Sequence, residues 1–273
     1  MSDGGGQTAV AVGPVTVGGS GPPAVIAGPC VIEELAQTVA LAERLAAACA
    51  RRGLGYVFKA SFDKANRTAL GSYRGPGLED GLHVLAAVQA EVGVPVLTDV
   101  HECAQAAVAA RVVDALQVPA FLCRQTDLLQ ACGRTGKPVQ IKKGQFMVPA
   151  DMRYAADKVR AAGGRPLVCE RGTAFGYGDL VVDMRSLVWL RATGCPVVFD
   201  GTHSVQQPGA GGHTGGRREM VPPLVRAAVA VGVDALYLEV HPEPERARCD
   251  GPNCLGLERF ESLLDEVVRL AQA

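Results

Sequence analysis

The feature that most restricts how this chain can fold is a repeated alternation between short apolar runs and longer segments of helical periodicity. Within 33–52, Leu41, Leu45 and Ala48 recur near the 3.6-residue period of a helix. Continuous apolar strands that alternate with helices are typical of a parallel sheet covered by helices, and eight such strands can close into a barrel. The eight predicted strands are Ala24–Ala27, Tyr56–Ala60, Pro95–Val100, Ala115–Val118, Val139–Lys142, Leu167–Cys169, Val197–Phe199 and Ala235–Val240.

The same alternation predicts one helix after each strand. An open, doubly wound sheet is the alternative architecture, but no Gly-x-Gly-x-x-Gly motif follows the first strand. The length of 273 residues also suits a single barrel, for which about 250 residues is typical. The predicted helices are Glu33–Arg52, Leu78–Val92, Glu102–Val112, Asp127–Arg134, Ala150–Ala162, Leu180–Ala192, Pro223–Val231 and Leu257–Ala273.

The N-terminus is expected to differ from the rest of the chain. Met1–Gln7 is glycine-rich and predicted to be flexible, whereas Thr8–Val12 and Val15–Val17 flank a Gly-Pro turn. Alternating apolar residues around such a turn predict a short β-hairpin, which could plug one end of a barrel. We therefore predict a flexible N-terminus and hairpin in 1–23, followed by one (β/α)8 barrel catalytic domain over 24–273.

The composition argues against several classes of function. The net charge is −1 and the pI about 6.5, so no global field attracts nucleic acid or a membrane, and any anion site must be local. The chain has no signal-peptide pattern and no unbroken run of about eighteen apolar residues, so neither export nor a membrane span is expected. The nine cysteines include no Cys-x-x-Cys pair, which favours reduced thiols and a cytoplasmic protein.

A polar group or a thiol stands at the end of every predicted strand. In a (β/α)8 barrel the carboxyl ends of the strands meet at one rim, where the chemistry takes place. A single charged strand end usually only reaches for solvent, but eight polar ends together favour a common site. In chain order these ends are Cys30, Lys59 with Ser61, Asp99, Gln117, Lys142 with Lys143, Glu170 with Arg171, Asp200 with His203, and Glu239 with His241.

One set of these residues is cationic. Arginine binds phosphate and carboxylate through paired hydrogen bonds, and lysine binds them as a point charge. The loop Ser72–Gly77 adds glycines that let backbone approach a phosphate closely. The set suits two phosphates and a carboxylate, although a solvated turn is the alternative explanation for isolated charges. Its members are Lys59, Lys64, Arg67, Arg74, Lys142 and Arg171.

A second set combines a thiol, an imidazole and two carboxylates. Cys30, His203, Glu239 and Asp250 are far apart in sequence, but closure makes the last strand the neighbour of the first, so the four are expected to converge. These ligand types suit a divalent ion such as zinc, iron(II), cobalt or manganese. On chemistry alone, a small apolar filler is the alternative role of Cys30.

Several long motifs resemble those of a known enzyme family. The motifs are Lys59–Arg67, Ser72–Glu79, Leu97–Glu102, Gln117–Asp127, Phe199–Ser204, His241–Glu245 and Cys249–Pro252. The similarity runs from about Ala24 to the C-terminus, and the chain is similar to 3-deoxy-D-manno-octulosonate 8-phosphate synthases on a (β/α)8 barrel. This resemblance implies the condensation of phosphoenolpyruvate, D-arabinose 5-phosphate and water to the octulosonate used in lipopolysaccharide, with release of phosphate.

The resemblance also implies roles for individual residues. Gln117, Lys142 and Arg171 match the phosphoenolpyruvate site of the family, with Lys59 and Lys64 alongside as catalytic candidates. The pentose phosphate site is matched by Asn66, Arg67 and Asp99, and Ser61 lies in the same motif. Arg124 matches an arginine that helps to hold the sugar phosphate of a neighbouring subunit, since the family is usually tetrameric.

The family has a metal-dependent class with cysteine at the position of Cys30 and a metal-independent class with asparagine there. This chain resembles the former, and His203, Glu239 and Asp250 match the other ligands. The glycine-rich segment Gln206–Gly216 matches a segment that is mobile in the family.

The expected reaction joins C3 of phosphoenolpyruvate to the sugar aldehyde while water adds to C2. Asp99 and His203 are candidates for moving protons. The nearest alternative is 3-deoxy-arabino-heptulosonate 7-phosphate synthase, which accepts erythrose 4-phosphate and has Lys-Pro-Arg where this chain has Lys64-Ala65-Asn66-Arg67. The motifs also leave open a metal-dependent aldolase and a non-catalytic sugar-phosphate-binding barrel.

Overall fold

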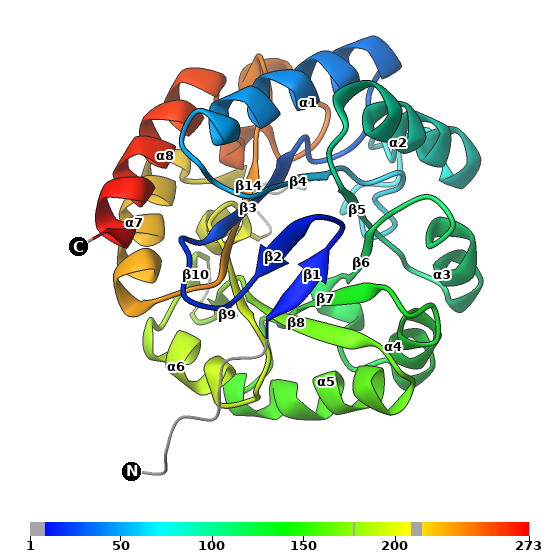
Figure 1. The fold of residues 1–273 in the computed structure, drawn as a ribbon, viewed down its shortest axis with the longest axis vertical. Coiled ribbons are helices and arrows are strands. Elements are labelled where there is room, and N and C mark those ends of the chain that lie inside the picture. The colour runs from blue at the N-terminus through cyan, green and yellow to red at the C-terminus, as the bar shows by residue number, and fades with distance from the viewer. Residues whose placement is uncertain (1–8, 177, 209–214, 273) are drawn as a thin grey trace.

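The computed structural model describes residues 9–176, 178–208 and 215–272. Eight parallel strands close into a barrel in the order β11-β14-β3-β4-β5-β6-β7-β8, and a ring of helices surrounds them (Figure 1). The predicted barrel is confirmed, with the last strand paired to the first. The strands are β3 (Ala24–Gly28), β4 (Tyr56–Lys59), β5 (Val96–Asp99), β6 (Ala115–Val118), β7 (Pro138–Lys142), β8 (Arg165–Glu170), β11 (Val197–Asp200) and β14 (Ala235–Glu239).

A helix follows each barrel strand, as predicted, and the boundaries differ mostly by one to three residues. The last residue of the predicted final helix, Ala273, lies outside the described residues. The helices are α1 (Leu35–Ala50), α2 (Leu78–Val92), α3 (Cys103–Ala109), α4 (Thr126–Gly133), α5 (Met152–Ala161), α6 (Arg185–Arg191), α7 (Val221–Val231) and α8 (Leu257–Ala271), with 3-10 turns η1 (Ala120–Leu122), η2 (Pro149–Asp151), η3 (His203–Val205), η4 (Arg218–Met220), η5 (Pro244–Arg246) and η6 (Gly251–Asn253).

One helix prediction, Leu180–Ala192, is wrong at its start. β10 (Leu180–Val181) is a short strand that pairs with β9 (Thr173–Ala174), and α6 begins only at Arg185. The carboxylate of Asp183 accepts a 3.0 Å hydrogen bond from the backbone N–H of Arg185. A side chain that satisfies a free N–H of the first turn favours a helix start at that point.

The predicted hairpin is also confirmed. β1 (Val10–Val12) pairs antiparallel with β2 (Val15–Val17), whereas Thr8 and the segment Met1–Gln7 lie outside the described residues. Gly13 in the turn has a φ of 54°, a conformation that glycine adopts without steric cost. Val10, Val12 and Val17 are buried in one apolar cluster with the inward side chains of the barrel. The hairpin therefore closes the amino-terminal end of the barrel (Figure 1).

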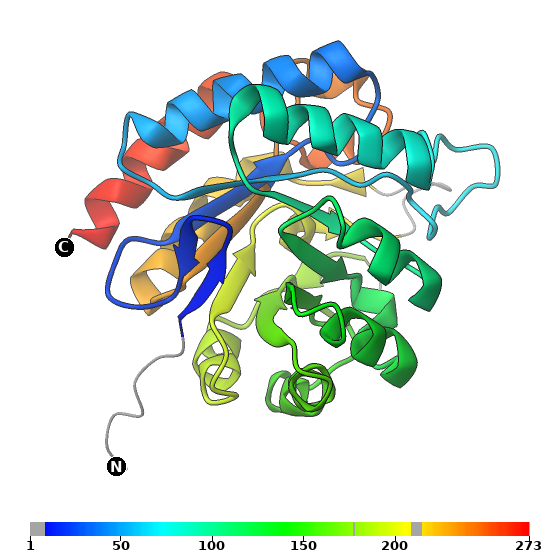
Figure 2. The same ribbon diagram turned by 45° about the vertical axis from the view of Figure 1, so that its right-hand side comes forward.

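The long connection after β4 projects from the opposite end of the barrel (Figure 2). At that end β3 and β4 approach closely, because a Cβ on Gly28 would stand 2.0 Å from the carbonyl oxygen of Lys59. Only glycine fits there, and it brings Cys30 and Lys59 to one rim. In the described part of the chain, no helix has the length and hydropathy to cross a membrane.

Candidate active site and metal centre

A cavity of about 400 Å³ opens at the carboxyl ends of the barrel strands. The predicted site residues that line it are Lys64, Asn66, Arg67, Asp99, Gln117, Lys142, Arg171, His203 and Asp250. Four further predicted site residues, Cys30, Lys59, Ser61 and Glu239, are buried around this end of the barrel without lining the cavity.

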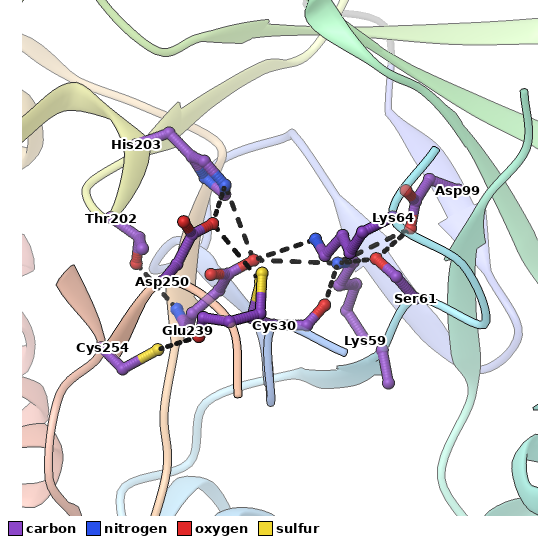
Figure 3. Close-up of polar contacts among 12 residues, drawn as sticks. Cys30, Lys59, Ser61, Lys64, Asp99, Thr202, His203, Glu239, Asp250 and Cys254 are labelled. Atoms are coloured by element: carbon purple, nitrogen blue, oxygen red, sulfur yellow. Dashed lines mark hydrogen bonds and ion pairs between the residues drawn. The ribbon is translucent and has the colours of Figure 1, made fainter. Parts of the chain in front are cut away.

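Lys59 and Asp99 form a buried polar chain through Ser61 (Figure 3). Lys59 Nζ donates to Ser61 Oγ at 2.8 Å, and Ser61 Oγ donates to Asp99 Oδ1 at 2.5 Å. Asp99 Oδ2 also lies 3.2 Å from His101 Nε2. Burial by itself raises the pKa of Asp99, but the charge of Lys59 and the contact with His101 hold it well below its ordinary value. Asp99 is therefore an ionised carboxylate on the cavity wall.

His203 is fixed from one side by an acid at the end of β11. Its Nδ1 lies 2.8 Å from Asp200 Oδ2, and its backbone N–H donates to Asp200 Oδ1 at 2.8 Å. Lys142 Nζ pairs with the same carboxylate and lies 3.5 Å from the ring centre of Tyr237. The contact with Asp200 fixes the ring so that Nε2 lies on the side away from that carboxylate.

The Nε2 atom of His203 points at two further carboxylates. It lies 3.6 Å from Glu239 Oε1 and 3.6 Å from Asp250 Oδ2, and these three side chains gather in Figure 3. The three ligand atoms lie close enough to one another to bind a metal ion jointly.

Glu239 offers a second observation in favour of a cation. Its Oε1 accepts a 3.0 Å hydrogen bond from the hydroxyl of Tyr237, but its buried Oε2 has no hydrogen-bond partner among the described residues. Burial raises the pKa of Glu239, but His203, Lys64 and Lys59 together lower it below its ordinary value. An ionised carboxylate with an unsatisfied buried oxygen is costly unless a cation binds there.

Cys30 completes the predicted ligand set from the end of β3. Its Sγ lies 3.3 Å from Asp250 Oδ2 and 2.6 Å from Cys249 Sγ, and both cysteines are free. Burial, followed by the contact with Cys249 and the charge of Asp250, raises the pKa of the Cys30 thiol well above its ordinary value. A bound divalent ion would oppose these effects, because it stabilises the thiolate form.

Asp250 is held in an unusual backbone conformation. Its φ of 50° is the only positive value at a non-glycine residue in the described ranges, and Asp tolerates this conformation better than most residues. Such strain is often found at functional sites. Here it turns Cys249 and Asp250, which are adjacent in sequence, toward the same sulfur of Cys30.

The cavity is also lined by a buried cation with unused donors. Arg171 is buried, its Nη2 donates to Gln206 Oε1 at 2.5 Å, and its Nε and Nη1 have no hydrogen-bond partner among the described residues. Burial lowers the pKa of Arg171, as expected for a charge held out of water. These donors suit an anion that enters the cavity.

Three predicted cations lie elsewhere. Lys143 points away from the cavity to Glu170 Oε1, at 3.4 Å. Arg74 pairs with Asp63 in an exposed position, so it is not part of the cavity wall. Arg124 is exposed and lines a separate groove with Lys158. The sequence suggested Lys143 and Arg74 as rim residues because strand ends and motifs do not reveal side-chain direction, whereas Arg124 was expected to act on a neighbouring subunit.

The structure adds residues that the sequence analysis did not assign to the site. Tyr237 lines the cavity beside Glu239, and the two-residue period of β14 could have revealed it, since both side chains point inward. Asp200 was already expected at the rim with His203, and the structure adds that its carboxylate contacts the ring of His203. Gln206, Arg248 and Gln145 also line the cavity but follow no pattern in the sequence.

Comparisons with known proteins agree with this geometry. The profile of the DAHP synthetase I family matches residues 7–273. A 2-dehydro-3-deoxyphosphooctonate aldolase from Syntrophotalea carbinolica is 57% identical over 261 residues, covering 95% of this chain and 94% of that protein. Proteins of the same name from Magnetococcus marinus and Acidithiobacillus ferrooxidans are 56% and 55% identical, covering 96% and 88% of this chain and 92% and 86% of their own.

The name of these relatives is a synonym for 3-deoxy-D-manno-octulosonate 8-phosphate synthase, so the resemblance seen in the sequence motifs is confirmed. The alternative heptulosonate synthase is not favoured, since these relatives carry the octulosonate name over nearly their whole length. The chain therefore belongs to the DAHP synthetase I family, alongside its 3-deoxy-D-manno-octulosonate 8-phosphate synthases.

Proposed function

We propose that the protein condenses phosphoenolpyruvate with D-arabinose 5-phosphate and water to 3-deoxy-D-manno-octulosonate 8-phosphate and inorganic phosphate. The observation that carries this proposal is the cavity itself, which is lined by Arg171, with its unused guanidinium donors, together with His203 and Asp250. An anion site beside a cluster of metal-binding side chains suits an anionic nucleophile and a carbonyl acceptor. The names of the similar proteins support the same reaction.

The two substrates are assigned to two parts of the cavity. Arg171, Lys142 and Gln117 would bind the phosphate and carboxylate of phosphoenolpyruvate, as point charges and paired donors. Asn66 and Arg67, on the loop after β4, would bind the sugar phosphate at the cavity mouth. Holding two polyanions at reacting distance can supply roughly 7–11 kcal/mol of barrier lowering.

Proton movement is assigned to the buried chain that ends at Asp99. This ionised carboxylate lines the cavity, and Lys59 and Ser61 hold its orientation. It can accept the proton of the water that adds to C2, while Lys59 and Lys64 stabilise negative charge nearby.

A divalent ion held by Cys30, His203, Glu239 and Asp250 is proposed as the cofactor. The unsatisfied Oε2 of Glu239 and the orientation of His203 by Asp200 support this assignment. When bound, such an ion supplies a Lewis acid beside the anion site. Zinc, iron(II), cobalt and manganese all remain candidates for these ligands.

A homotetramer in the cytoplasm completes the proposal. Arg124 lies outside the cavity of its own chain, in a groove beside the exposed aromatic side chains of Phe146 and Tyr154. Exposed apolar side chains that cluster in this way favour an interface between subunits, through which Arg124 could reach a neighbouring cavity. The nine free cysteines favour a reducing compartment.

A phosphate-release assay with two acceptor sugars tests the reaction. Purified protein is given phosphoenolpyruvate with arabinose 5-phosphate or with erythrose 4-phosphate, and the products are identified by mass spectrometry. We expect phosphate release that depends on both substrates and strongly favours the five-carbon sugar.

Each competing function gives a different result. A preference for erythrose 4-phosphate would indicate a heptulosonate synthase, and a condensation without release of phosphate would indicate an aldolase. Binding of either sugar phosphate by calorimetry, without turnover, would indicate a non-catalytic barrel. Size-exclusion chromatography with light scattering, on the wild type and on Arg124→Ala, tests the tetramer and the role of Arg124.

A further inference from the structure

The last feature of the site is a second thiol that none of the assigned roles uses. Cys249 lines the cavity, is 3% exposed, and stands 2.6 Å from the sulfur of Cys30. We propose that Cys249 is an additional metal ligand, so that the ion is held by two thiolates as well as by His203, Glu239 and Asp250. This inference rests on the metal site of the proposed function.

The arrangement of possible ligand atoms supports a shared site. Cys30, Cys249 and Asp250 form one cluster whose ligand atoms all lie within 4.8 Å of one another. His203, Glu239 and Asp250 form a second cluster with the same spacing. Because Asp250 belongs to both, the two clusters adjoin at its carboxylate.

The backbone of the loop after β14 is shaped to present both neighbouring side chains. Two consecutive residues in an extended chain point in opposite directions, but the positive φ of Asp250 changes this direction. Cys249 and Asp250 consequently both contact the Cys30 sulfur. The turn at Asp250 thus presents two neighbouring side chains of one loop to the same sulfur.

A cation faces the Cys249 sulfur from the cavity side. Arg67 Nη1 donates to Cys249 Sγ at 2.8 Å, and Arg67 Nη2 donates to the carbonyl of Arg248 at 3.2 Å. Arg67 would thereby fix the position of the sulfur and would connect the sugar phosphate site to the metal site.

A second thiolate changes which ions the site prefers. Soft sulfur ligands select zinc, iron(II) or cobalt over manganese, which favours oxygen ligands. Among the four candidate ions, the proposal therefore places manganese last.

Cobalt(II) substitution tests the ligand directly, because each cobalt–thiolate bond adds intensity to an ultraviolet charge-transfer band. The wild type, Cys249→Ser, Cys249→Ala and Cys30→Ser are loaded with cobalt(II) alone, and bound cobalt is measured by elemental analysis. We expect each variant to show about half of the wild-type band per bound cobalt, a two-fold loss, since one of two thiolate bonds is removed. Cys254→Ser is the matched control, since Cys254 lies in the same loop and does not line the cavity.

The possible results distinguish the loss of the second thiolate ligand from the loss of the whole metal site. A full band in both Cys249 variants, or no band in Cys30→Ser, would overturn the second thiolate and leave a single-thiolate metal site standing. A Cys30–Cys249 disulfide in the cobalt-loaded wild type, found by mass spectrometry, would also overturn it. A wild type that binds no cobalt, zinc or iron(II) would overturn the metal site together with this ligand.

Discussion

The two ends of the barrel are built from the same strands but from opposite kinds of side chain. At the amino-terminal end, Val10, Val12 and Val17 of the hairpin pack on inward-facing apolar residues. At the carboxyl end, Lys59, Asp99 and other charged residues are buried to a similar degree. One end gains free energy from removing apolar surface from water, whereas the other must offset the cost of desolvated charge.

This difference separates stability from chemistry along each strand. β14, for example, contributes Ala235 to the hairpin cluster and Glu239 to the metal-binding cluster. Changes at the apolar end are expected to alter the free energy of unfolding without altering the reaction. Changes at the polar end are expected to alter the reaction without altering the free energy of unfolding. The following predictions test this division.

Metal removal should have the largest effect, and it acts at the polar end only. Treatment with a chelator is expected to lower kcat at least about a thousand-fold, because a Lewis acid contributes several kcal/mol to the barrier. Activity should return when zinc or cobalt is added back. Full turnover by protein that elemental analysis shows to be metal-free would contradict this division, since the polar end would then catalyse the reaction without a metal ion.

Arg171→Met should lower kcat/KM for phosphoenolpyruvate by roughly a hundred- to a thousand-fold, because it removes buried donors that face the cavity. Steady-state kinetics at varied phosphoenolpyruvate measures this. Arg74→Ala is the matched control, since that guanidinium pairs with Asp63 outside the cavity. Equal losses in both variants would contradict the assignment of the anion site.

Asp200→Asn should weaken metal binding by about 10–100-fold, as expected when the partner of a metal-binding histidine is altered. The Asn side chain can no longer attract the Nδ1 proton of His203 with a full charge. Competition with a coloured chelator measures the affinity. An unchanged affinity would show that His203 is oriented by other contacts.

Val17→Ala should have no effect on kcat while lowering the free energy of unfolding by about 2 kcal/mol, since it removes buried methyl groups and leaves a small void. Val17 is fully buried in the hairpin cluster. Urea unfolding measures the free energy of unfolding, and steady-state kinetics on the same preparation measures kcat. Thr16→Ala, at an exposed position of the same strand, should leave both quantities unchanged. A fall in kcat for Val17→Ala would show that the two ends are coupled.

Much of the architecture could be predicted because it depends on local pattern. The apolar runs at Tyr56–Ala60 and Ala235–Val240 identified their strands, and their polar ends identified the rim. The helix start near Arg185 was missed, because the contact of Asp183 with a backbone N–H is a matter of local geometry that periodicity does not report. The segment Gln206–Gly216 was predicted to be mobile; its ends pair as β12 (Gln206–Gln207) and β13 (Gly215–Gly216), and 209–214 lie outside the described residues.

The sequence by itself determined the barrel, the hairpin and the membership of the family, because strand periodicity, helix periodicity and long motifs are properties of neighbouring residues. Only the tertiary structure decided which of the polar strand ends meet. It turned Lys143 and Arg74 away from the cavity and brought Cys249 to Cys30 across 219 positions of the chain. The physical reason is that side-chain direction depends on strand register, on backbone dihedrals such as that of Asp250, and on partners contributed by distant strands.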